Sequence, residues 1–226
     1  MYQPIVVNYQ ATSSVYTANQ WLHELSTKDI IACDFEAAVK YSQAELDSWR
    51  SLLDTDLPRL ERIRIESILS ATALDHPSHC ALTHCSIATS ESDSYVFIFD
   101  NPKILRRVLN FLVTTNVKQI WHNASYDFKH IQFNTGSMPL NYEDSAILAK
   151  CILNHCDKTK ATVGLKELAG KWYGEWAISP DNFDLSQMHD LKVLLYAATD
   201  SCATFKLYHS MRTYIETTKV ANAINN

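Results

Sequence analysis

The sequence predicts a mixed α/β domain in which a central sheet is flanked by helices. Short β-branched apolar runs, typical of strands, alternate with longer stretches whose apolar residues recur at helical spacing. The chain has 226 residues, of which 46% are hydrophobic and 20% charged, which is typical of a globular protein with a sizeable core. Because no internal repeat, low-complexity segment or linker interrupts this pattern, we expect one domain over residues 1–226.

The first elements in chain order are a strand, a helix and a buried strand. The β-branched run at residues 5–8 predicts the first strand, and the apolar spacing of residues 18–25 predicts the helix. Residues 29–36 form a short apolar run that ends in two carboxylates, Asp34 and Glu36. This pattern indicates a central strand that delivers acidic groups at its end.

A helical insertion is expected after this strand, at about residues 40–75. Ser42 and Glu45 have the spacing of a capping box, and Pro58 is well placed to begin a second helix, so the segment reads as a helical hairpin. Its basic side chains could contact a phosphate backbone, but interleaved acidic residues favour a solvated helix face. These residues are Arg59, Arg62 and Arg64, with Glu61 and Glu66 between and after them.

The second half predicts two further strands, at residues 80–89 and 95–99, joined by a polar turn as an antiparallel pair. A helix begins at Asn101-Pro102, a strand covers residues 118–122, and Asn123 is a natural N-cap for the helix that follows. Residues 191–214 form the longest helix candidate. The resulting sheet is mixed, and its first three strands are expected to be antiparallel.

Composition excludes several classes of protein. With 20 Lys and Arg against 25 Asp and Glu, the formal charge is -5, so no broad basic face predicts tight binding to long duplex DNA. The apolar runs are too short to span a membrane. The chain begins without a secretory signal, and its six cysteines are too sparse for a disulfide framework. We therefore expect a cytoplasmic protein, or one of the host cytoplasm if it is virally encoded.

Three local patterns place acidic groups where one site could form. Alternate residues of a strand share a face, so Asp34 and Glu36 can address one metal ion. Carboxylate oxygens suit Mg²⁺ or Mn²⁺. The other two patterns are Asn123-Ala-Ser-Tyr126-Asp127 at the carboxyl end of a strand, and Tyr196-Ala-Ala-Thr-Asp200 within a helix. Each pattern alone has an ordinary structural explanation: an exposed strand, a helix cap, or a packed Tyr beside a solvated Asp.

In this order the three patterns resemble the motifs of the DEDD 3′–5′ exonucleases, in the subclass with a Tyr in the last motif. The likeness is greatest to the proofreading domain of the polymerase I family (family A) of DNA polymerases. Residues 143–148 and 164–169 resemble further segments of that family, and the resemblance spans about residues 5–211. It implies a ribonuclease H-like fold and metal-dependent release of nucleoside 5′-monophosphates from single-stranded or frayed DNA 3′ ends.

The resemblance also implies a role for each motif residue. Two divalent metal ions, Mg²⁺ or Mn²⁺, would be held by the four carboxylates, and a phenol would orient the attacking water. Asn123 and Tyr126 would lie near the terminal nucleotide. The implied metal ligands are Asp34, Glu36, Asp127 and Asp200, and the phenol is that of Tyr196. A phenol of ordinary pKa, about 10, is a poor base at neutral pH, so the metal ions would do most of the activation.

Two departures from the family leave questions open. Ala37 replaces a common Thr or Ser, and position 195 is Leu195 where another subclass has His. The chain is expected to be a stand-alone nuclease, an excised or split proofreading domain of a polymerase, or a nuclease that acts with a separate DNA polymerase. The alternatives are an RNA-trimming nuclease resembling ribonuclease D, which shares these motifs, and a catalytically silent binding module.

Two clusters of Cys and His invite a zinc hypothesis, although their spacing matches no common zinc motif. The first cluster contains His76, His79, Cys80, His84 and Cys85, and the second contains Cys151, His155 and Cys156. Ordinary buried thiols and surface imidazoles are the favoured interpretation.

Overall fold

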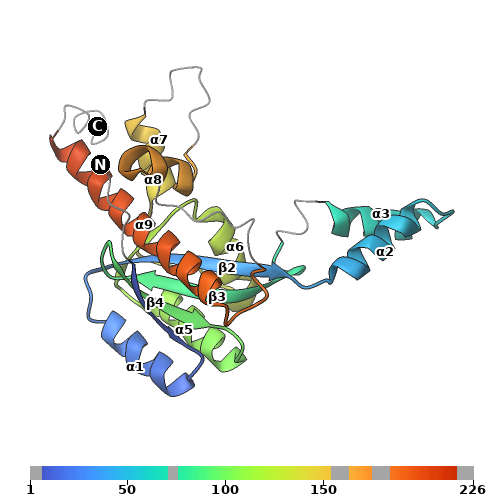
Figure 1. Ribbon diagram of the computed structural model, residues 1–226, viewed down its shortest axis with the longest axis horizontal. Coiled ribbons are helices and arrows are strands. Elements are labelled where there is room, and N and C mark those ends of the chain that lie inside the picture. The colour runs from blue at the N-terminus through green and yellow to red at the C-terminus, as the bar shows by residue number, and fades with distance from the viewer. Residues whose placement is uncertain (1–6, 71–75, 154–162, 175–183, 218–226) are drawn as a thin grey trace.

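The computed structural model describes residues 7–70, 76–153, 163–174 and 184–217, and shows a six-stranded sheet with helices on both faces (Figure 1). The strands are β1 (Asn8–Thr12), β2 (Ile30–Val39), β3 (Cys80–Ala88), β4 (Asp93–Ile98), β5 (Lys118–Trp121) and β6 (Tyr142–Asp144). Their order across the sheet is β1-β4-β3-β2-β5-β6. The mixed α/β class predicted from the sequence is confirmed.

The helices follow the predicted sequence of elements, with short connections to the strands. They are α1 (Val15–Leu25), α2 (Gln43–Leu53), α3 (Arg59–Leu69), α5 (Pro102–Thr114), α6 (Ser125–Thr135), α7 (Ser145–Ile152), α8 (Leu165–Tyr173) and α9 (Leu191–Thr217). As expected, α9 is the longest of the described helices, and Asn101 caps α5 through a hydrogen bond from the Lys103 N–H.

The antiparallel run is formed by β2, β3 and β4 and not by the first three strands of the chain, while β5 and β6 join it in parallel. The opening strand lies later than predicted: β1 begins at Asn8 and pairs parallel with β4 at the edge of the sheet. Of the predicted segment 5–8, residues 5 and 6 fall outside the described residues. The helical insertion therefore follows the second strand in chain order.

The two faces of the sheet are covered by different helices. Alternate residues of β2, namely Ile31, Cys33 and Phe35, point into a core that includes α1, α5 and α6. Ala32, on the opposite face, packs in the cluster formed with α7, α8 and α9. Because side chains of a strand alternate, Asp34 and Glu36 must lie on the α9 face.

The hairpin of α2 and α3 projects away from the sheet beyond the end of β2 (Figure 1). The predicted capping box is present, since Ser42 Oγ accepts from the Glu45 N–H and Glu45 accepts from the Ser42 N–H. Arg62 donates to the carbonyl oxygens of Leu53 and Thr55, at 2.8 and 2.9 Å. This side chain therefore closes the hairpin turn.

No described helix has both the length and the apolar character needed to cross a bilayer.

Candidate active site

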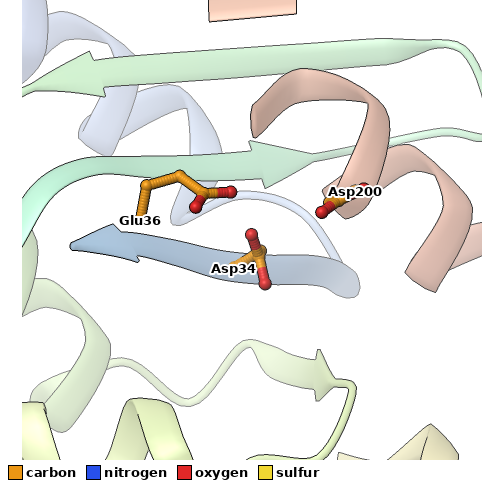
Figure 2. A group of neighbouring side chains, drawn as sticks. All are labelled: Asp34, Glu36 and Asp200. Atoms are coloured by element: carbon orange, nitrogen blue, oxygen red, sulfur yellow. The ribbon is translucent and has the colours of Figure 1, made fainter. Parts of the chain in front are cut away.

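Three carboxylates from two distant parts of the chain meet on the α9 face of the sheet. Oxygens of Asp34 and Glu36, on β2, and of Asp200, on α9, all lie within 4.8 Å of one another. Figure 2 shows the three side chains pointing toward a common space between the strand and the helix. The structure therefore brings together three of the four carboxylates that the sequence motifs predicted as metal ligands.

The position of Glu36 depends on an irregularity in the sheet. The register between β2 and β3 shifts between Glu36 and Ala37, where Glu36 pairs with His84 and Ala37 pairs with Leu82. The intervening Thr83 donates its hydroxyl to the Glu36 carbonyl oxygen at 3.1 Å. Bulges commonly re-aim side chains beside active sites. The strand also continues to Val39, so the acidic pair lies inside β2 and not at its end as predicted.

Asp127, the fourth predicted carboxylate, reaches the same strand from the first turn of α6. Its Oδ1 accepts a hydrogen bond from the Phe35 N–H at 3.1 Å, between the two acidic residues of β2. Asp127 is buried and lies outside the 4.8 Å group. Its charge nevertheless acts on Asp34, whose pKa it helps to raise.

Burial raises the pKa values of all four carboxyls, and repulsion between neighbouring carboxylates adds to the effect at Asp34 and Glu36. Loss of solvent raises the pKa of Asp34 and of Glu36 well above their usual values, and the charges of the neighbouring carboxylates add to the effect. Burial raises the pKa of Asp127 to about 8, although the hydrogen bond from Phe35 opposes it. Burial raises the pKa of Asp200 to about 6, against the lowering effect of nearby Lys166.

This donor set fits hard divalent cations. Buried carboxylates at such close range are unfavourable unless a cation or protons compensate them. Lys166 supplies a single positive charge, 3.6 Å from Asp200, against three clustered acidic groups. All the oxygens come from carboxylates, which Mg²⁺ and Mn²⁺ prefer. The residues present therefore suit divalent metal ions.

Asn123 does not cap α6, in contrast to the prediction. Its φ is 59°, the only positive φ at a non-glycine residue in the described chain, and Ala124 takes the N-cap position. Asp144, at the end of β6, accepts from the N–H groups of Asn123 and Ala124 at 3.0 and 2.9 Å. A carboxylate from the neighbouring strand thus holds this turn and the start of the helix that carries Asp127.

Tyr196 and Asp200 lie one turn apart on α9, as predicted, and a lysine that sequence reasoning missed joins them. Lys166 Nζ donates to the Tyr196 phenolic oxygen at 2.6 Å. Burial, with the charges of Asp200 and Glu36, raises the pKa of Tyr196 above its usual value. The phenol is therefore neutral at physiological pH. No spacing rule selects Lys166, because only the docking of α8 brings it to the acidic residues.

A half-buried histidine, His122, connects the sheet to the start of α8. His122 Nε2 lies 2.8 Å from the Val163 carbonyl oxygen, and because a carbonyl can only accept, this nitrogen carries the proton. The contact joins the end of β5 to the residue before Gly164, the N-cap of α8. Lys166 then follows in the first turn of the helix.

A pocket of about 460 Å³ opens between β2, the β5–α6 turn, α8 and α9. Its lining includes Asp34, Asn123, Lys150, Lys166, Tyr196 and Asp200. Tyr126 is not part of this lining; its ring instead packs 5.1 Å from that of His130. The mixture of carboxylates and lysines can bind cations and phosphate groups side by side.

The zinc hypothesis finds no support in the described part of the chain. Asp34, Glu36 and Asp200 are the one group of three or more metal-ligating residues found there. The histidines and cysteines at residues 76–85 form no such group, and Cys80 and Cys85 are buried thiols. Residues 155 and 156 lie outside the described residues.

Comparisons with known proteins agree with this geometry. The model of a 3′–5′ exonuclease family of the DNA polymerase A type matches residues 71–216. No curated protein sequence matches the chain.

Several solved structures share the fold at low sequence identity. NrnC of Brucella melitensis, which has also been solved with Mg²⁺ and with pGG, has a TM-score of 0.57 and 14% identity, over 95% of this chain and 83% of that one. RNase D of Escherichia coli has a TM-score of 0.62 and 14% identity, over 93% of this chain and 46% of that one. The catalytic core of RRP6 from Trypanosoma brucei has a TM-score of 0.65 and 12% identity, over 97% of this chain and 51% of that one. The chain thus spans about half the length of the last two.

Proposed function

Because this chain belongs to the 3′–5′ exonuclease family whose model matches its residues 71–216, we propose that it releases nucleoside 5′-monophosphates from the 3′ ends of DNA. Membership makes it a hydrolytic nuclease of the DEDD type. The observation that carries the proposal is the convergence of Asp34, Glu36 and Asp200 within 4.8 Å beside a pocket that also contains lysines.

Two divalent metal ions are the cofactors proposed for this site. Asp34, Glu36 and Asp200 would hold them. Asp127, which accepts a hydrogen bond from the Phe35 N–H on β2, would provide a fourth carboxylate. Bound there, the ions would supply Lewis-acid chemistry, activating water and offsetting charge on the phosphate. The protein's own part is to hold the acidic oxygens in place before the substrate arrives.

Tyr196 is proposed to orient the attacking water and not to remove its proton. The phenol keeps its proton at working pH, accepts a hydrogen bond from Lys166, and also hydrogen-bonds Asp200. Because Lys166 donates to the phenolic oxygen, the phenolic hydrogen points away from Lys166, toward an acceptor such as Asp200. The ammonium group would also offset charge that develops on the scissile phosphate.

Asn123 and Tyr126 are proposed to contact the terminal nucleotide. Asn123 lines the pocket with its side chain on an exposed, left-handed turn, which suits a contact with a ligand. Tyr126 lies one residue before Asp127 in the first turn of α6 and is half-buried. Its ring would stack on a base.

DNA is the proposed substrate because the family match is to the exonuclease of DNA polymerases, which also supports a proofreading role beside a separate polymerase. RNA is a second candidate, favoured by the structural neighbours, among which are RNase D and NrnC bound to pGG. Recognition of RNA depends on contacts to the 2′-OH, and Ala37 leaves no hydroxyl at a position close to the acidic pair.

The deciding experiment is a product ladder with four substrates that share one sequence: single-stranded DNA, duplex DNA with a mismatched 3′ end, matched duplex DNA, and RNA. We expect Mg²⁺- or Mn²⁺-dependent mononucleotide release, fastest on the first two. Equal or faster attack on RNA would establish the second candidate. Absence of release from every substrate with either ion would overturn the exonuclease proposal.

A further inference from the structure

Five aromatic rings form a connected row from α6 to the base of the projecting hairpin. The ring of Phe133 packs 6.3 Å from that of His76, which lies 6.3 Å from His79. The row continues to Tyr41, 5.7 Å from His79, and to Trp49, 4.8 Å from Tyr41. We call these five residues the aromatic track.

The aromatic track is partly exposed to solvent, unlike the aromatic residues of the hydrophobic core. Phe133 is 57% exposed and His76 is also exposed, while Tyr41, His79 and Trp49 are half-buried. A hydrogen bond of 2.8 Å between Tyr41 Oη and His79 Nδ1 fixes the middle of the row. Fixed aromatic rings that keep a free surface are a preformed binding platform.

Two members of the aromatic track, Phe133 and Tyr41, lie on segments that also carry acidic residues of the site. Phe133 is near the end of α6, the helix whose first turn carries Asp127. Tyr41 follows Glu36 by five residues along the extension of β2, which corresponds to about 16 Å of extended chain. A strand whose 3′ end lies at the carboxylates therefore meets these rings a few nucleotides upstream.

We propose that the aromatic track binds unpaired bases of the substrate strand upstream of its 3′ end, by stacking. The proposal rests on the proposed exonuclease function and adds a second contact region to it. Stacking on aromatic rings accepts any base, because every base has a π face. Lys129, exposed on α6 between Tyr126 and Phe133, is placed to contact the backbone phosphates of the same strand.

A nucleic-acid strand fits the aromatic track better than a protein partner does. Phe133 and Tyr41 lie on the segments that lead to the site where the 3′ end must be held, so an occupant that arrives with the substrate can reach them. Four of the five rings, those of Tyr41, Trp49, His76 and His79, also carry polar atoms, which can hydrogen-bond to bases or phosphates beside the flat ring faces. The row of planar side chains thus matches a single strand.

The test compares wild-type protein with Phe133→Ala, Phe133→Trp and a control, Tyr16→Ala, which removes an aromatic ring that is 72% exposed on α1. Binding of fluorescein-labelled dT12 is measured by anisotropy in EDTA, so that hydrolysis plays no part. We expect Phe133→Ala to raise Kd about tenfold, Phe133→Trp to keep wild-type binding, and Tyr16→Ala to have no effect. Thermal melting checks that each variant is folded.

A second arm removes bases from the substrate instead of rings from the protein. An oligonucleotide with abasic sites upstream of its last three nucleotides keeps every phosphate. It should bind wild-type protein more than tenfold more weakly than dT12, and the difference between the two strands should be smaller for Phe133→Ala, which keeps the other four rings. Similar binding of dT12 by wild type and Phe133→Ala would overturn the proposal and leave a protein partner or a structural brace.

The outcomes separate this proposal from the proposed function. Ring-dependent binding without any metal-dependent release would retain the aromatic track and reject the exonuclease. If nucleotides are released from the 3′ end, but neither the rate nor the binding depends on Phe133 or on the upstream bases, the aromatic track alone is rejected.

Discussion

The Lys166 ammonium nitrogen lies 2.6 Å from the phenolic oxygen of Tyr196, in a site otherwise dominated by carboxylates. The same nitrogen is 4.0 Å from the centroid of the Tyr196 ring. This contact joins α8 to α9 across the pocket and provides a cation that the recognised motifs do not include.

Replacing Lys166 with Met should lower kcat about tenfold to a hundredfold. The variant keeps the length of the side chain but removes the donor that positions the Tyr196 phenol and its positive charge. Single-turnover hydrolysis of a short oligonucleotide measures the chemical step. Lys171→Met, an exposed position on the same helix, is the matched control and should behave as wild type. Equal rates for both variants would show that the contact has no part in catalysis.

Replacing Tyr196 with Phe should lower kcat without removing a limb from the pH profile. Because burial and neighbouring acidic groups hold the pKa of the phenol above its usual value, the hydroxyl stays neutral throughout the working range. It can orient water but cannot serve as the base. A pH–rate profile checks this: an alkaline rise present in wild type and lost in Tyr196→Phe would contradict the neutral phenol.

Replacing Asp144 with Ala should cost both stability and activity. Its carboxylate accepts from the N–H groups of Asn123, Ala124 and Ala146, so the loss in unfolding free energy should be about 1–2 kcal/mol. Activity should also fall because the turn that leads to Asp127 loosens. Asn101→Ala removes another N-cap and should cost similar stability only. Urea unfolding and mononucleotide release measure the two effects, and full activity in Asp144→Ala would reject its positioning role.

In the metal-free protein, stability should decline as the pH rises from about 6.5 to about 8, and it should level off above about pH 9. A carboxyl whose pKa is raised in the folded state keeps a proton that the unfolded chain has already lost, so the free energy of unfolding falls as the pH rises. Asp127, with its pKa raised to about 8, titrates in this window. Burial lowers the pKa values of His84 and of the half-buried His122, so both histidines finish titrating below this pH range.

Divalent ions should reverse that decline, because metal and protons compete for the same oxygens. The rise in Tm on adding Mn²⁺ should therefore be larger at about pH 8.5 than at about pH 6.5. Melting curves in EDTA and in Mn²⁺ at several pH values measure both effects. A Tm that is independent of pH in EDTA, with no metal response, would contradict the buried acidic site.

Most elements could be predicted from the sequence because their signals are local. The capping box at Ser42 and Glu45 and the Asn101-Pro102 helix start were predicted correctly from short-range patterns. The motif spacing also anticipated that Asp200 would join Asp34 and Glu36. Such features need only a few neighbouring residues, or a recognised order of motifs.

The failures have a common physical cause, which is contact between distant segments. Asn is a favoured residue type at N-caps, but Asn123 adopts a left-handed conformation in which its N–H donates to Asp144. Ala124 therefore occupies the N-cap position of α6. β2 runs past its acidic pair because pairing with β3 continues to Val39. Lys166 reaches the site only through the docking of α8, which no local pattern reports.

The most direct test of the central claim is Mn²⁺-dependent release of mononucleotides from a 3′-end-labelled single strand, comparing wild type with Asp34→Asn. The substitution keeps the shape of the side chain and removes a charged oxygen from the 4.8 Å group. We predict a loss of about a thousandfold or more in rate, together with weaker Mn²⁺ binding by calorimetry. An Asp34→Asn protein that is as active as wild type would contradict the assignment of this acidic cluster as the catalytic centre.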